Sequence, residues 1–220
     1  MTDEMRAKVE KVMKNLERNK MKPYFCENRE EAQALVKTLI KKGETISCGG
    51  SKTLDETGIY QIINSSDYNF LDRSAPGMTR PEVEEVYRQT FRADTFFMST
   101  NALTENGELY NVDGNSNRVA ALLYGPKSVI VVCGINKIVK NIDEAIKRVK
   151  TIAAPQNTIR LGIETPCGKT GECVSLRKEN PELCDGCHGD TRICCNYVVS
   201  AQQRHIDRIK VIIIGEEYGY

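Results

Sequence analysis

The stretch that decides the fold is Gly125-Pro-Lys-Ser-Val-Ile-Val-Val-Cys-Gly134. Its apolar run, Val129–Cys133, is rich in β-branched side chains and bounded by turn residues, which is typical of a strand buried on both faces. The next segment places apolar residues at helical spacing, at Ile142, Ala145, Ile146, Val149 and Ile152. A buried strand followed by an amphipathic helix is the repeating unit of a parallel sheet.

The same alternation continues on both sides of this unit. Short apolar segments at 45–48, 95–100, 109–112 and 208–215 are predicted strands. Helices are predicted over residues 1–20, 28–40, 81–90 and 117–124. We therefore expect an α/β fold, with a mostly parallel sheet flanked by helices, in one domain over residues 1–220. A cysteine-rich insertion at 165–195 precedes the last strand.

Charge and composition argue against several classes of protein. The 31 Lys and Arg residues nearly balance the 30 Asp and Glu residues, so no net charge favours a nucleic acid or an anionic membrane as a partner. The N-terminus lacks the apolar run of a secretory signal, and the longest apolar runs are too short to span a bilayer. A cytoplasmic location is expected, where thiols stay reduced, so the nine cysteines require a use other than structural disulfides.

Six of the nine cysteines are concentrated between positions 167 and 195, in the spacing C-x5-C-x10-C-x2-C-x6-C-C. Packing explains this density poorly, because the segment interrupts the apolar pattern. Four thiolates in one loop suit tetrahedral zinc or an iron–sulfur cluster. Reduced thiols, or disulfides formed on oxidation, are the alternative. The adjacent Cys194 and Cys195 are not both expected to bind.

A glycine turn, Ser47-Cys-Gly-Gly-Ser-Lys-Thr53, follows a predicted strand and precedes a short predicted helix. Backbone N–H groups at such a turn can approach an anion, and a helix N-terminus adds a favourable dipole. The candidate anion-binding residues are Gly49, Gly50, Ser51 and Thr53. An ordinary strand-to-helix turn is an equally good interpretation. Asp55 and Glu56 are candidate catalytic carboxylates, although acidic residues also favour a helix N-terminus for electrostatic reasons alone.

A second concentration of polar residues follows two predicted strands. Because ligands of open α/β sheets bind at the carboxyl ends of the strands, these residues are expected to face the same crevice as the glycine turn. The candidate ligand-binding residues are Asn101, Asp113, Asn115, Asn117 and Arg118, of which Asp113 is also a candidate catalytic group. Turn formation is the alternative role, since Asn, Asp and Gly dominate turns.

Two longer stretches resemble the lactate-utilisation (LUD) domain family. They are Thr100-Asn-Ala-Leu-Thr-Glu-Asn-Gly-Glu-Leu-Tyr-Asn-Val-Asp-Gly-Asn-Ser-Asn-Arg-Val-Ala-Ala121 and Gly125-Pro-Lys-Ser-Val-Ile-Val-Val-Cys-Gly-Ile-Asn-Lys-Ile-Val139. The resemblance covers about residues 20–215 and implies the NagB/RpiA/CoA transferase-like fold, which ribose-5-phosphate isomerase and glucosamine-6-phosphate deaminase share. It also implies a role in oxidising lactate to pyruvate together with iron–sulfur partner proteins.

A subgroup of that family resembles the chain in the cysteine segment as well. Its pattern corresponds to Thr170-Gly-Glu-Cys173, to Cys184 with Cys187, and to Arg192-Ile-Cys194. The metal ligands that this resemblance implies are Cys167, Cys173, Cys184, Cys187 and Cys194, with Cys173 and Cys184 competing for one ligand position. A [4Fe-4S] cluster is the expected cofactor, and zinc is the alternative.

Three functional hypotheses follow. The first is a redox-associated protein whose cluster lies beside a crevice for a small carboxylate or phosphate, and which works with an iron–sulfur oxidoreductase partner. The second is a non-redox enzyme of isomerase or CoA-transferase type, in which zinc is structural and Asp55, Glu56 or Asp113 supplies the chemistry. The third is a non-catalytic sensor or assembly subunit. A homo-oligomer is compatible with all three.

Overall fold

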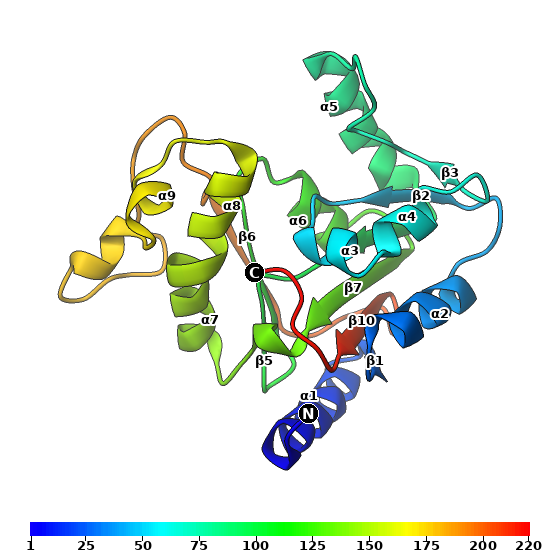
Figure 1. Ribbon diagram of the computed structural model, residues 1–220, viewed down its shortest axis with the longest axis horizontal. Coiled ribbons are helices and arrows are strands. Elements are labelled where there is room, and N and C mark those ends of the chain that lie inside the picture. The colour runs from blue at the N-terminus through cyan, green and yellow to red at the C-terminus, as the bar shows by residue number, and fades with distance from the viewer.

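A six-stranded parallel sheet forms the centre of the fold in the computed structural model, which describes residues 1–220 (Figure 1). Its strands are β1 (Lys22–Cys26), β2 (Thr45–Cys48), β3 (Asn69–Phe70), β4 (Thr95–Met98), β7 (Ser128–Gly134) and β10 (Ile209–Ile214). They lie in the order β1-β10-β7-β4-β2-β3, and every neighbouring pair is parallel. The predicted strand at 129–133 is therefore β7, in the middle of the sheet, and the predicted α/β fold is confirmed.

Helices cover both faces of this sheet, because alternate side chains of each strand point to opposite sides. The helices are α1 (Asp3–Arg18), α2 (Arg29–Leu39), α3 (Lys52–Glu56), α4 (Ile59–Ile63), α5 (Arg80–Gln89) with the 3-10 turn η1 (Thr90–Arg92), and α6 (Asn117–Leu123). Ile130 and Val132 of β7 pack in one apolar cluster with α2, α3 and α4. Val129 and Val131 pack in a second cluster with α1 and α6. The continuous apolar run of β7 thus serves two cores.

Two predicted helix starts are confirmed by their caps. Thr2 Oγ1 accepts a hydrogen bond from Met5 N at 3.2 Å, and Asn28 Oδ1 accepts one from Glu31 N at 2.9 Å. Each cap satisfies a backbone N–H group that the first helical turn leaves without a partner. These contacts fix where α1 and α2 begin.

A second, four-stranded sheet was not predicted. Its strands are β5 (Ala102–Thr104), β6 (Leu109–Asp113), β8 (Ile138–Val139) and β9 (Asn196–Ser200), in the order β8-β5-β6-β9. A turn at 105–108 joins β5 and β6 into an antiparallel hairpin, and β9 pairs antiparallel with β6. Tyr110 and Ala102 of this sheet pack against Ala145 and Val149 of the helical layer beside it.

The helical stripe that begins at Ile142 extends further than predicted. It comprises α7 (Ile142–Arg148), a π-helical stretch η3 (Val149–Ala153) and α8 (Ala154–Leu161). Pro155, in the first turn of α8, has no N–H group to donate to the preceding turn. Within η3 the carbonyl of Lys150 accepts a hydrogen bond from Cys173 N at 2.8 Å. This bond ties the cysteine-rich segment to the helix.

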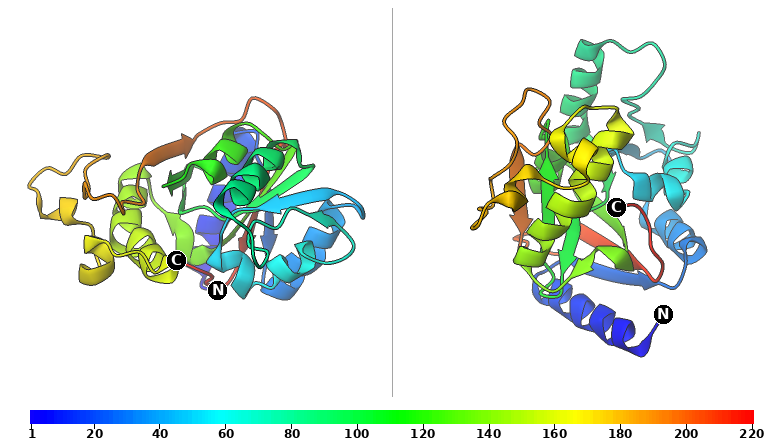
Figure 2. Two further views of the ribbon diagram at one scale, coloured as in Figure 1. Left: turned by 90° about the horizontal axis from the view of Figure 1, so that it is seen from above. Right: turned by 60° about the vertical axis from the view of Figure 1, so that its left-hand side comes forward.

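The cysteine-rich segment lies beside α8 and leads into β9. It contains a short helix, α9 (Pro166–Thr170), and a 3-10 turn, η4 (Val174–Arg177), and is otherwise irregular up to β9. Figure 2 shows it, in yellow and orange, at one side of the molecule, away from β1 and α2. No helix in the protein combines the length and apolar composition needed to cross a membrane.

Candidate functional site

A cavity of about 410 Å³, here called the crevice, lies where the glycine turn after β2 meets the ends of β4 and β6. Most of the predicted ligand-binding residues line it: Gly50, Ser51, Asn101, Asp113, Asn115, Asn117 and Arg118. Gly49 and Thr53 are buried and are not among the lining residues. Asp55 and Glu56 are exposed and do not line the crevice. The structure therefore brings together the two polar concentrations that the sequence suggested.

Two guanidinium groups converge on the glycine turn. A β-carbon at Gly50 would lie 2.5 Å from Arg73 Nη2 and 3.8 Å from Arg160 Nη2. Ser51 caps α3 through a hydrogen bond from Leu54 N at 3.2 Å, but α3 has only five residues. Positive charge at this turn therefore comes from arginine side chains that the sequence analysis did not select, and little comes from a helix dipole.

Arg73 and Arg160 have no carboxylate partner, since neither takes part in an ion pair. Arg73 Nη1 donates to the hydroxyl of Tyr87 at 3.3 Å. Arg160 Nε donates to the hydroxyl of Tyr220 at 2.7 Å, and its Nη2 donates to Asn157 Oδ1 at 2.7 Å. Neutral partners hold both side chains without neutralising them, so their charge is available to an anion.

Arg118, in contrast, has its donors occupied within the protein. Its Nη1 donates to Asn111 Oδ1 at 2.6 Å and to the carbonyl of Ser99, directly after β4, at 3.1 Å. Its Nη2 donates to Asn101 Oδ1 at 3.1 Å. Asp113 Oδ2 lies 3.3 Å from Arg118 Nε, outside hydrogen-bonding geometry, so the two form an ion pair with one buried acceptor unsatisfied. Arg118 positions the ends of β4 and β6, and Asp113 balances its charge.

Lys137, at the end of the 3-10 turn η2 (Ile135–Lys137), is a crevice residue that the sequence analysis missed. It is 3% exposed, and its Nζ donates to Thr53 Oγ1 at 2.8 Å and to Ser99 Oγ at 3.0 Å. Burial, reinforced by the nearby positive charge of Arg148, lowers the pKa of Lys137 to about 7. The sequence signal that could have identified Lys137 is its position directly after the apolar strand β7, at a strand end where ligands of such sheets bind.

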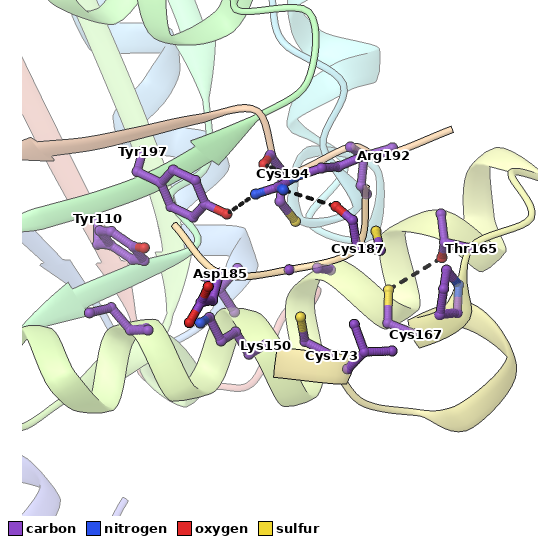
Figure 3. A pocket seen from close by; sticks show the side chains of 17 residues that line it. Tyr110, Lys150, Thr165, Cys167, Cys173, Asp185, Cys187, Arg192, Cys194 and Tyr197 are labelled. Carbon is purple, nitrogen blue, oxygen red and sulfur yellow. Dashed lines mark hydrogen bonds between the residues drawn. The ribbon is translucent and has the colours of Figure 1, made fainter. Parts of the chain in front are cut away.

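A second, smaller cavity of about 30 Å³, here called the cysteine cavity, is lined by Cys167, Cys173, Cys187 and Cys194 (Figure 3). Burial raises the pKa of Cys194 to about 12, and the neighbouring side chains of Cys167, Cys173 and Cys187 add to that shift. Cys184 and Cys195 are exposed and do not line the cavity. No three Cys, His, Asp or Glu side chains are already arranged to hold a metal ion.

Arg192 fixes the backbone around this cavity. Its three nitrogens donate to the carbonyls of Cys184, Cys187 and Cys194, at 2.8, 2.9 and 2.8 Å. Its Nη2 also donates to the hydroxyl of Tyr197 at 3.0 Å (Figure 3). One guanidinium group therefore sets the positions of three of the six clustered cysteines. The remaining cysteines, Cys26, Cys48 and Cys133, belong to the apolar cores.

Tyr110 of β6 brings a polar group to the cysteine cavity that has no partner. The residue is 1% exposed, lines the cavity, and its hydroxyl makes no hydrogen bond. Buried hydroxyl groups are almost always paired. An unpaired hydroxyl beside four thiols is therefore an observation that favours an additional group in this cavity.

The two cavities share part of one wall. Cys194 lines both of them, as do its neighbour Ile193 and the helical residues Val149 and Ala154. A ligand in the crevice and a group held by the cysteines would therefore lie against shared residues.

The chain matches one protein-family model and is similar to solved structures. A family model described as the LUD domain matches residues 9–214. The chain is similar to a DUF162 family protein from Deinococcus radiodurans, with a TM-score of 0.50 and 14% identity, covering 98% of this chain and 99% of that one. It is more distantly similar to eIF2B beta from Chaetomium thermophilum (TM-score 0.35, 16% identity, 54% of this chain and 42% of that one). A search of curated proteins found no match.

Proposed function

Since the chain belongs to the LUD domain family, we propose that it is a redox-associated protein of the lactate-utilisation type. In this proposal the crevice binds a small carboxylate or phosphate, and Cys167, Cys173, Cys187 and Cys194 hold an iron–sulfur cluster next to it. The observation that carries the proposal is that Cys194 lines both cavities.

The chemistry of the cysteine cavity fits an iron–sulfur cluster. Four thiols line one cavity, and thiolates are the usual ligands of such clusters. The unpaired hydroxyl of Tyr110 supplies a hydrogen-bond donor to sulfur, which is one of the ways a protein tunes a cluster. A bound cluster would supply one-electron transfer. Zinc suits the same four ligands, but it carries no electrons, so a zinc site would not explain why the cysteines adjoin the crevice.

The charge of the crevice fits an anion. The cationic residues that line it outnumber the acidic ones, since Asp113 is the single acidic residue against Lys52, Arg73, Arg80, Arg118 and Arg160. Asp113 is already paired with Arg118. Of the three predicted catalytic carboxylates, none is therefore both free and inside the crevice, which weighs against the isomerase and CoA-transferase hypothesis.

We further propose that the protein acts in the cytoplasm and exchanges electrons with an iron–sulfur oxidoreductase. The exposed position of Cys184 and Cys195, at the outer side of the cysteine-rich segment, is compatible with a partner that approaches there. A single-electron carrier needs such a partner, because oxidation of a 2-hydroxy acid releases two electrons.

The test is anaerobic purification followed by iron, sulfide and zinc analysis and a visible spectrum. We expect iron and sulfide with broad visible absorbance, lost in Cys167→Ser, Cys173→Ser, Cys187→Ser and Cys194→Ser. Cys195→Ser is the matched control, because Cys195 is adjacent to Cys194 but lines neither cavity. Cys184→Ser decides the remaining ligand question, and we expect it to retain the cluster. Zinc without visible absorbance would reject the redox proposal.

A further inference from the structure

Lys137 is a buried lysine that no step proposed so far uses. Its Nζ has two hydrogen-bond partners, the hydroxyls of Thr53 and Ser99, and no carboxylate partner. The residue is 3% exposed and lines the crevice. A buried ammonium group that lacks a carboxylate is costly, so such a group is normally paired or changes its protonation state.

The two hydroxyls accept hydrogen bonds from Lys137 rather than donate to it. Thr53 Oγ1 donates its own hydrogen to the carbonyl of Tyr218 at 3.3 Å, and Ser99 Oγ lies 3.5 Å from the carbonyl of Thr100 as a weak donor. Each hydroxyl has one hydrogen, so the remaining lone pairs face Nζ. A neutral amine can satisfy both acceptors with its two hydrogens, which leaves its lone pair without a protein partner.

The surrounding charges favour the neutral amine. Burial is the largest cause of the lowered pKa of Lys137, and the positive charges of Arg148 and Arg118 lower it further. Cys133 and Glu56 raise the pKa, but by less than burial lowers it. The pKa of Lys137 is therefore about 7, so a large fraction of the side chain is deprotonated at neutral pH. Desolvation beside other cations is a known way of activating a lysine as a nucleophile.

We propose that Lys137 forms an imine with a 2-oxo acid bound in the crevice. The lone pair of Nζ attacks the C2 carbonyl carbon, and a carbon–nitrogen bond forms as the carbonyl π electrons move to oxygen. Protons from nitrogen and from solvent convert that oxygen to water, which leaves as the carbon–nitrogen double bond forms. No oxidant is consumed. The choice of a carboxylate-bearing carbonyl compound rests on the proposed anion binding in the crevice.

The experiment uses pyruvate as the probe and sodium borohydride as the trap, with intact-mass and peptide analysis. We expect one reduced pyruvate adduct, located on Lys137. Lys137→Arg, which keeps a long basic side chain but cannot form an imine, should lose the adduct. Lys210→Arg is the matched control, because Lys210 also has a lowered pKa but is only half-buried and lies in β10, outside the crevice. An adduct that persists in Lys137→Arg, or none in the wild-type protein, would overturn the proposal.

Two further measurements separate this inference from the proposed function. Thr53→Val keeps the lysine but removes one acceptor, and it should reduce the adduct yield several-fold. The initial trapping rate should rise about tenfold from pH 6 to pH 8, as the amine deprotonates. Pyruvate binding without trapping would overturn the imine and leave the crevice intact. Trapping in anaerobically purified protein that contains zinc and no iron would support the imine while rejecting the redox proposal.

Discussion

The crevice and the cysteine cavity share a wall, but different interactions hold their side chains in place. In the crevice, Arg118 is hydrogen-bonded to residues at the ends of β4 and β6, so the protein itself holds its guanidinium. The buried Asp113 Oδ2 has no hydrogen-bond partner, but its charge is balanced by Arg118. In the cysteine cavity, one arginine holds the backbone of an irregular segment and the hydroxyl of Tyr110 has no partner. The comparison separates a crevice whose central arginine is fixed by the sheet from a cavity formed by an irregular segment around an unpaired buried hydroxyl.

The largest effect should come from Arg192→Gln. This change removes hydrogen bonds to three cysteine carbonyls, so we expect cluster loading to fall to background. It should also cost about 2–4 kcal/mol of local unfolding free energy in the segment 165–195, measured by hydrogen exchange. Anion binding in the crevice should remain. Arg177→Gln is the control, because Arg177 is an exposed arginine of η4. Full cluster loading in Arg192→Gln would show that Arg192 is not needed to organise the cysteine cavity.

The crevice should respond next, to Arg73→Gln and Arg160→Gln. Each removes an unpaired guanidinium that converges on Gly50, so we expect about tenfold weaker binding of phosphate or lactate by calorimetry. Cluster loading should not change. Arg88→Gln is the control, because Arg88 is exposed and lies near Glu84 and Glu85 in α5. Equal weakening in the control would point to general charge rather than to a site.

A third difference concerns pH. The pKa of Lys137 is lowered from its ordinary value of 10.5 to about 7, so between these values the unfolded chain binds one more proton than the folded chain. The unfolding free energy should therefore rise with pH in this window, by up to about 1.4 kcal/mol per unit from this group. Arg148, Arg118, Cys133 and Glu56 are the charged or titratable groups that contribute to the shift. Urea unfolding of Lys137→Met should lack this component, and identical pH profiles would contradict the assignment.

The smallest effect should come from Tyr110→Phe. Removing an unpaired buried hydroxyl should stabilise the cluster-free protein by about 1 kcal/mol. Tyr197→Phe should destabilise it by a similar amount, because the Tyr197 hydroxyl accepts from Arg192. In the cluster-loaded protein the gain of Tyr110→Phe should disappear. Denaturant midpoints of both variants, with and without the cluster, test this pair, and a loss of stability in cluster-free Tyr110→Phe would show that the hydroxyl is satisfied.

The parallel sheet could be predicted from sequence because β7 and β10 carry long apolar runs. The second sheet could not, since β8 has two residues and β5 has three, which is too short for a periodic pattern. β9 follows the cysteines directly and alternates poorly in burial. The strand at 109–112 was predicted as part of β6, but its hairpin partner β5 was not.

The sequence indicated which residues line the crevice better than it indicated what each residue does there. Asn101, Asp113 and Gly50 do line one crevice, because strand ends and the turn after β2 meet there. The sequence could not show that Arg118 donates its hydrogen bonds within the protein. Its acceptors lie directly after β4 and in β6, and only the folded chain brings them to Arg118. Nor could spacing choose between Cys173 and Cys184. In the structure, Cys173 lines the cavity and its N–H donates to the carbonyl of Lys150 in η3, whereas Cys184 is exposed.

The wall that contains Cys194 has a thermodynamic consequence under the proposed function. If a crevice ligand binds more tightly to one oxidation state of the cluster, the same ligand must shift the cluster's midpoint potential by the equivalent free energy. A negatively charged ligand next to Cys194 would favour the oxidised, less negative cluster and so lower that potential. Substrate occupancy would then govern the direction in which electrons leave the protein.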